Sequence, residues 1–222
     1  MACGGPTGNS EGNRDLDKGL EAEYKETYTR FEGKPEELEK FLDEHKPSDP
    51  AWNTENTDWI CVDNSLEDLD RGESDLEKAV EMWIDLLRSG KVVPKRIIEI
   101  ALDTKCTSGE WMIFRHRREI DEDWKKIAEA TVAGKLGYSA NVATAYGSVN
   151  SKRSNGIGTH LISVHTKSFA DEDDVWRIEK ELRSMGIDGT LKYKPDIHTW
   201  FDIYVGNEFN IRPSIYISQP KK

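Results

Sequence analysis

The sequence predicts an α+β fold, in which a mixed but mainly antiparallel sheet has helices packed on one face. Short segments alternate apolar and polar side chains, as half-buried strands do. Longer segments between them carry apolar residues on a single helical stripe, bounded by capping residues and glycines. Short links between some strands favour antiparallel pairing, and helices with one apolar stripe pack against one face of a sheet.

The chain is expected to contain a tail, an extension and one domain. Residues 1–20 are rich in Gly, Asn, Asp and Ser and nearly lack apolar side chains, so we expect a disordered tail. Residues 21–50 are expected to form a helical extension, in which Pro35 starts a short amphipathic helix that ends at the PSDP sequence. Residues 51–222 are long enough for a single α+β domain with its own core.

The first half of this domain is predicted to contain one strand and two helices. DWICVD at 58–63 alternates apolar and polar residues and is expected to be a strand. Ser74 and Glu77 have the spacing of a capping box, which begins a helix that Gly90 ends. Pro94 suits the first position of a second helix.

The second half is expected to alternate strands with two further helices. Asp121 and Asp171 are the predicted N-terminal caps, and Gly134 and Gly186 the corresponding helix ends. The predicted strands are GEWMIF (109–114), Ser139–Tyr146, His160–Thr166, TLKYK (190–194), WFDIYV (200–205) and SIYIS (214–218). The residues expected to share one core between sheet and helices are Trp111, Trp124, Ile162, Val164, Val175, Ile178 and Leu182.

Composition narrows the classes of partner. A net charge of −11 does not attract phosphate backbones by bulk charge, so nucleic acid would need a local basic patch. The three cysteines form no CxxC pair, which favours free thiols in a reducing cytoplasm. No secretory signal and no run of about 18 apolar residues is present, so we expect a cytoplasmic protein with no membrane partner.

The sequence offers little support for catalysis, a cofactor or a metal. Cys106 and His116 are ten residues apart, which establishes no geometry for a nucleophile and its base. His160 and His165 lie five apart on one predicted strand, so they point to opposite faces and cannot share a metal. The acidic residues 171–174 suit the start of a helix, where the macrodipole favours them. We therefore expect a protein that is not an enzyme.

Three phrases, SGEW at 108–111, VHTKSFADED at 164–173 and YKPDIHTW at 193–200, resemble the basophilic-leukaemia-expressed protein family. The resemblance covers about Trp59 to Ser218. It implies the fold of the cap-binding translation initiation factor, which is a curved sheet backed by helices. The cap-binding factor places a Trp-Glu pair before its Gly-x-Trp strand, whereas no aromatic residue precedes Trp111 in IIEIALDTKCTSGEW. We therefore expect no aromatic sandwich around a methylated guanine cap.

The resemblance also gives Trp83 two interpretations. AVEMWIDLL looks like the tryptophan-bearing helix of the cap-binding factor, where the tryptophan is exposed and receives a partner peptide. On its own predicted helix, Trp83 belongs to the apolar stripe, which favours a place in the core. An exposed Trp83 would indicate a protein–protein interaction module that binds a helical peptide, and a buried one would indicate packing.

Basic and aromatic residues suggest a ligand site near the end of the chain. We expect RNA or a nucleotide to bind on the face of the sheet, because cations pair with phosphates and aromatic faces stack on bases. Pro195 should end its strand, which would bring neighbouring side chains to the strand end. The opposing interpretation is a structural corner with solvated charges and packed aromatics. The candidate residues are Lys152, Arg153, Lys192, Lys194, His198 and Trp200.

Overall fold

A computed structural model of the chain describes residues 26–64, 74–150 and 159–220. The predicted tail at 1–20 and the candidate residues Lys152 and Arg153 lie outside these residues. Within the described residues, no helix is both long and apolar enough to cross a membrane.

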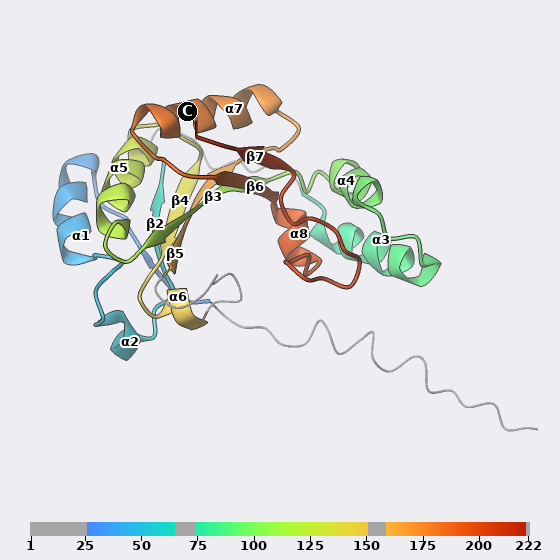
Figure 1. Cartoon of the computed structure of the whole chain (residues 1–222), viewed down its shortest axis with the longest axis horizontal. Helices are drawn as coiled ribbons and strands as arrows, with labels where there is room; N and C mark the ends of the chain where they lie inside the picture. The colour runs from blue at the N-terminus through green and yellow to red at the C-terminus, as the bar shows by residue number, and fades with distance from the viewer. Residues whose placement is uncertain (1–25, 65–73, 151–158, 221–222) are drawn as a thin grey trace, which may run out of the picture.

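The described strands form one curved sheet in the order β1-β2-β4-β5-β3-β6-β7 (Figure 1). Neighbouring strands are antiparallel, except that β1 runs parallel to β2. The predicted mixed, mainly antiparallel sheet is therefore confirmed. The strands are β1 (Tyr28–Arg30), β2 (Trp59–Asp63), β3 (Gly109–His116), β4 (Ser139–Ala143), β5 (Thr159–Thr166), β6 (Leu191–Pro195) and β7 (Tyr216–Ser218).

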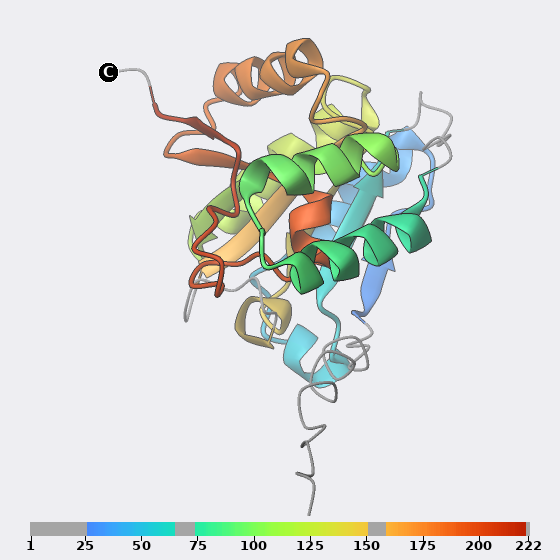
Figure 2. The same cartoon turned by 90° about the vertical axis from the view of Figure 1, so that its right-hand side faces the viewer.

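Most of the helices, although not α2 and α6, occupy the outer, convex side of the sheet or lie beyond one of its ends (Figure 1). Helices α1, α5 and α7 lie along the convex side, and α3, α4 and α8 lie beyond the end of the sheet (Figure 1). Figure 2 shows α3 and α4 side by side with α8 behind them. The helices are α1 (Leu38–Glu44), α2 (Trp52–Glu55), α3 (Leu76–Ser89), α4 (Pro94–Asp103), α5 (Ile120–Val132), α6 (Gly147–Asn150), α7 (Glu172–Ser184) and α8 (Asp196–Trp200), with a 3-10 turn at Pro35–Glu37.

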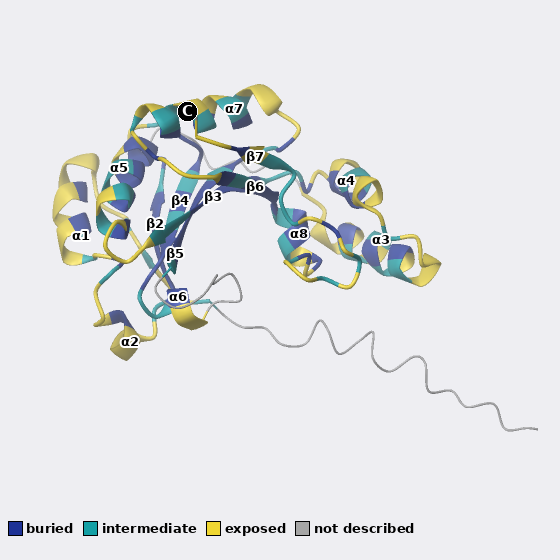
Figure 3. Ribbon diagram, viewed as in Figure 1, coloured by how far each residue is buried: buried dark blue, intermediate teal, exposed yellow. Residues whose placement is uncertain are grey.

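The main hydrophobic core fills the space between the convex face and its helices (Figure 3). The indole of Trp111 reaches from β3 to α7, where its Nε1 donates a 2.9 Å hydrogen bond to the carbonyl oxygen of Val175. All seven predicted core residues belong to this one cluster and are at most 1% exposed. This part of the prediction is confirmed.

Several predicted boundaries are also confirmed. Pro94 occupies the first turn of α4, and the side chain of Asp171 accepts a hydrogen bond from the Asp174 amide at the start of α7. Gly90, Gly134 and Gly186 all have positive φ where a helix ends. These positions follow from local chemistry, because a glycine without Cβ enters the left-handed region at little cost.

Other boundaries differ from the prediction. The cap of α3 is Asp75, whose carboxylate accepts from the Lys78 amide, and not Ser74. Asp121 lies within α5 and binds the amide and hydroxyl of Ser48, so a long-range partner takes the carboxylate that the sequence assigned to a cap. The strand predicted at 139–146 ends at Ala143.

Two segments do not form the secondary structure that the sequence predicted for them. WFDIYV at 200–205 is not a strand, because Pro195 ends β6 and residues 196–200 form α8. Ile197 and Phe201 are one helical turn apart and both are buried, so helical packing overrides the alternation. In the predicted helical extension, residues 28–30 form β1, which pairs with β2 ahead of the expected helix α1.

Candidate functional site: the inner face of the sheet and the cavity at its end

The strands present a second, mainly polar set of side chains on the inner, concave face of the sheet. Along β2, Ile60 and Val62 join the main core, whereas Trp59 and Cys61 belong to a separate small cluster. Side chains alternate between faces along a strand, so the other strands divide in the same way. The inner face is therefore the side of the sheet away from the main core.

The strand register arranges the inner face in three rows. An apolar row is followed by a middle row and then by a polar row, so polarity rises steadily along the strands. The apolar row is Trp59, Ala143, Leu161 and Phe114. The middle row is Cys61, Asn141, Ser163, Met112 and Lys192. The polar row is Asp63, Ser139, His165, Glu110 and Lys194.

Two neighbours, one in the middle row and one in the polar row, determine the tautomer of a neutral His165. Its Nε2 lies 3.1 Å from the Asn141 side-chain nitrogen, which can only donate, so Nε2 accepts. The proton of a neutral His165 then sits on Nδ1, which lies 4.0 Å from a carboxylate oxygen of Glu110. At the next position of the row, the Lys194 ammonium lies 3.7 Å from the centroid of the Tyr204 ring.

Among the described residues, at least three polar atoms of the inner face are buried without a hydrogen-bond partner. They are Oδ1 of Asp63, Oδ1 of Asn141 and Oγ of Ser163. Asn141 and Ser163 are direct cross-strand neighbours, and Asp63 lies diagonally from Asn141. A buried polar group without a partner costs about 1–3 kcal/mol, so a cluster of three marks a place where a ligand can supply hydrogen bonds.

The thiol on this face is not a nucleophile. Cys61 is 3% exposed, and burial raises its pKa to about 12, with the nearby Asp63 adding to the increase and Arg30 opposing it. The thiolate is the reactive form, so the raised pKa disfavours Cys61 as a nucleophile at neutral pH.

A cavity of about 140 Å³ lies at the end of the sheet where β3 begins and β5 and β6 end. We call it the sheet-end cavity. Within the polar row, His165 approaches it, because its ring lies 5.9 Å from the ring of Tyr138. The cavity is lined by Ser74, Lys105, Cys106, Ser108, Tyr138, Lys167, Asp196 and Trp200.

The described residues of the predicted ligand site do not converge on one point. Lys192 and Lys194 lie on the inner face, whereas Trp200 is 39% exposed and lines the sheet-end cavity. His198 is buried with its Nδ1 2.7 Å from the Pro213 carbonyl oxygen, and burial lowers its pKa, an effect that this hydrogen bond opposes. Pro195 does end its strand, but α8 then turns these side chains in different directions.

Trp83 lies in the core and not on the surface. It is 9% exposed and stacks on Phe201, with ring centroids 4.6 Å apart and planes at 5°. Phe209 meets it edge-on at 5.6 Å. The condition for a partner site at Trp83 is therefore not met, because its ring holds α3 against the C-terminal segment.

The geometry also separates the two residue pairs considered from sequence, one for catalysis and one for a metal. Cys106 lies three residues before the start of β3 and His116 ends it, so the length of the strand separates them by roughly 20 Å at 3.3 Å per residue. His160 and His165 fall on opposite faces, because His160 is 2.8 Å from the Ala143 carbonyl oxygen and is absent from the inner-face rows. No group of three metal-ligating side chains occurs among the described residues.

A comparison with known protein families identifies one that this chain matches. A model of the basophilic leukemia-expressed protein Bles03 family matches residues 84–202, which is more than half of the chain. The chain belongs to this family. The match runs from the second half of α3 to just beyond α8 and includes Glu110, Asn141, Ser163 and His165 of the inner face. The resemblance expected from the sequence is thus confirmed for the Bles03 family.

Solved structures with partial similarity to this Bles03 chain are cap-binding proteins. Ascaris suum eIF4E-3 with an m2,2,7G cap is 13% identical, with a TM-score of 0.36 over 50% of this chain and 57% of that chain. A schistosome eIF4E complexed with m7GpppA and 4E-BP is 16% identical, with a TM-score of 0.37 over 50% and 59%. The Bles03 chain thus spans less than two thirds of the length of either protein.

Sequence reasoning missed most of the groups that the structure brings together. Asn141, Ser163 and His165 are ordinary polar residues in strands, and only the pairing of β4 with β5 makes them neighbours. Lys105 and Lys167 follow an element end in separate parts of the chain. One signal was present, because polar residues alternate with Ile162 and Val164 in a strand whose other face is fully buried.

Proposed function

We propose that this protein is a non-enzymatic binding module that holds a nucleotide, free or within single-stranded RNA, on the inner face of its sheet. The observation that carries the proposal is the cluster of unpartnered buried atoms on Asp63, Asn141 and Ser163, beside an apolar row. The inner face thus places apolar side chains next to hydrogen-bonding groups.

A nucleobase has the complementary shape and chemistry. Its ring is flat and apolar on both sides, and its edge carries amino and ring N–H donors beside acceptors. The carboxylate of Asp63 and the amide oxygen of Asn141 accept hydrogen bonds, and the hydroxyl of Ser163 can donate or accept. The ring would lie toward Trp59, Leu161 and Phe114 in the apolar row.

Lys192 supplies a cation on the same face for the phosphate. It occupies the middle row on β6, two positions from Lys194 and opposite Met112 on β3. A chain of net charge −11 attracts phosphate only where cations are focused, so we expect few phosphate contacts and a shallow dependence of affinity on salt.

The enzymatic alternative would use Ser163, His165 and Glu110, which resemble a nucleophile, base and orienting acid. The three groups follow one another in the order that such a triad needs, but they are not joined by the hydrogen bonds that it needs. The Nε2 atom of His165 accepts from Asn141, and the Ser163 hydroxyl has no hydrogen-bond partner. A serine nucleophile needs the base within hydrogen-bond reach. This arrangement favours binding over acyl transfer.

The test is titration calorimetry with the four nucleoside monophosphates and a short single-stranded RNA. Binding by the parent protein, weakened about fivefold or more in Ser163→Ala, supports the proposal, since one hydrogen bond contributes about 1 kcal/mol. Ser184→Ala on α7 is the matched control, because its hydroxyl lies on the outer side and bonds only to the Glu181 carbonyl oxygen in the described contacts. Equal affinity of the Ser163→Ala and parent proteins, or no binding by the parent, refutes it.

A further inference from the structure

The end of α4 departs from the ends of two other long helices. In α5 and α7 the residue after the cap is Gly134 or Gly186 with positive φ, and the next amide reaches back five residues to a helix carbonyl. Helix α4 ends with the same two hydrogen bonds, from the Lys105 amide to Leu102 and from Cys106 to Ala101. Its left-handed residue, however, is Lys105, with φ of 56°.

A lysine is an unusual residue for this conformation. The other described non-glycine residues with positive φ are Asn56, Asp202 and Asn210, which are types that enter the left-handed region most readily. Glycine would relieve the clash between Cβ and the backbone at position 105. A strained residue whose side chain has no packing role is a candidate for function, and Lys105 is exposed.

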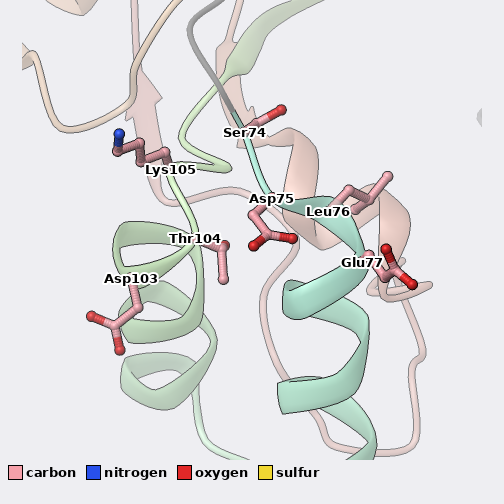
Figure 4. Close-up of a pocket in the computed structure, with 7 residues that line it drawn as sticks. All are labelled: Ser74, Asp75, Leu76, Glu77, Asp103, Thr104 and Lys105. Carbon is pink, nitrogen blue, oxygen red and sulfur yellow. The ribbon is translucent and has the colours of Figure 1, made fainter.

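The side chain of Lys105 lies between two cavities of different charge. A pocket of about 550 Å³ between the start of α3 and the end of α4 carries the carboxylates of Asp75, Glu77 and Asp103 (Figure 4). The Lys105 side chain extends away from Asp75 and Glu77 in that view. It also lines the sheet-end cavity, where a second lysine, Lys167, comes from the segment after β5.

The sheet-end cavity combines cations, hydroxyl groups and rings. Among the described residues that line the cavity, Lys105 and Lys167 are cationic and Asp196 is anionic, and Oδ2 of Asp196 accepts a 2.6 Å hydrogen bond from Ser108. The rings of Tyr138 and Trp200 complete the lining. Cations together with an aromatic face suit a phosphate that is attached to a ring.

The size of the cavity decides which part of the ligand enters. A volume of about 140 Å³ is roughly that of four to five water molecules, which admits a phosphate group but not a whole nucleotide. Trp200 is 39% exposed, so its ring is available to stack on a group outside. An internal phosphodiester would need room for chain on both sides, so the geometry favours a terminal phosphate.

We propose that the sheet-end cavity is a phosphate site for a monoester of a ring-bearing ligand, such as a nucleoside or aryl phosphate, with Lys105 and Lys167 at the phosphate and Trp200 on the ring. This site uses none of the unpartnered inner-face atoms. The two proposals are therefore independent, and each can be refuted without the other.

The test is titration calorimetry with inorganic phosphate, phenyl phosphate and adenosine monophosphate, at low and moderate salt. Both esters should bind at least about fivefold more tightly than inorganic phosphate, because stacking adds to the ionic contacts. Trp200→Ala should remove that difference, and Lys105→Gly should weaken all three ligands about tenfold. Lys91→Ala is the control for loss of one exposed lysine and should bind like the parent.

Lys105→Gly also distinguishes a lost site from a lost fold. Glycine relieves the left-handed strain, so its melting temperature should equal or exceed that of the parent. Ser163→Ala should bind phenyl phosphate like the parent, even if it fails with nucleotides. Failure of the parent to bind phenyl phosphate at millimolar concentration overturns the proposal, as does unchanged binding by Lys105→Gly.

Discussion

The two faces of the sheet carry opposite kinds of side chain on the same strands. On β5, Ile162 and Val164 are fully buried in the main core, whereas Ser163 and His165 between and beside them point to the inner face. The outer face satisfies the demands of stability, because its residues are apolar and closely packed. The inner face keeps a buried hydroxyl without a partner, which a face selected for stability alone would replace by an apolar group.

The largest expected effect is on the outer face. Trp124 of α5 is 1% exposed and packs in the main core, so Trp124→Ala should lower the free energy of unfolding by about 3–5 kcal/mol. Urea denaturation followed by circular dichroism measures the loss. Trp200→Ala provides the control for removing an indole, because that ring is partly exposed and should cost much less. Similar losses in the two variants would contradict the assignment of the core to the outer face.

A somewhat smaller loss is expected in the helices beyond the end of the sheet. Trp83 stacks on Phe201 and Phe209, so Trp83→Ala should cost about 3 kcal/mol and expose the contact between α3 and the C-terminal segment. Hydrogen exchange should show the loosening in α3 and in residues 201–211. An unchanged melting curve would show that Trp83 is not packed in the core, and the peptide-binding interpretation would then apply.

The sequence was sufficient for the outer face and insufficient for the inner one. Trp111, Ile162 and Val175 could be assigned to a core because their apolar character repeats with the period of a strand or helix. Nothing comparable identifies Asn141 or Ser163, because a polar residue on a strand is compatible with solvent. Their burial and adjacency arise from pairing between strands that are distant in sequence, which local pattern does not encode.

The same limit explains why the residues of the predicted ligand site lie apart in the structure. Lys192, Lys194 and Trp200 were grouped because they are close in sequence around Pro195. The structure ends β6 there as expected, but α8 then carries Trp200 to the sheet-end cavity. Its basic neighbour in that cavity, Lys105, follows α4, almost a hundred residues earlier. A continuous stretch of sequence was a poor guide to a cavity whose lining comes from the ends of several elements.

Acid should weaken the fold through two buried histidines. Burial lowers the pKa of His160 and of His198, although a backbone carbonyl oxygen opposes the shift in each. The unfolded chain then binds more protons than the folded chain as the pH falls below about 6.5, so stability present above that pH is lost on acidification. Urea midpoints at pH 7.5 and 5.5 measure the change.

Substitution of His198 assigns part of that pH dependence. His198→Asn keeps a donor for the Pro213 carbonyl oxygen and removes the titrating ring, so its midpoint should vary less with pH than that of the parent. His116→Gln, at an exposed end of β3, should leave the dependence unchanged. Equal pH dependence in the His198→Asn and parent proteins would show that His198 does not contribute.

The smallest expected effect on stability gives the sharpest contrast between the faces. Ile162 and Ser163 are adjacent on β5 and both are fully buried, but they point in opposite directions. Ile162→Ala should cost about 2–5 kcal/mol through the cavity that it leaves. Ser163→Ala removes a hydroxyl that has no partner, so the free energy of unfolding should stay the same or rise slightly, by up to about 1 kcal/mol. Equilibrium urea unfolding of the two variants under identical conditions makes the comparison. A loss of more than about 1 kcal/mol in Ser163→Ala would mean that the Ser163 hydroxyl has a hydrogen-bond partner in the folded protein. The main observation that supports a binding surface on the inner face would then be wrong.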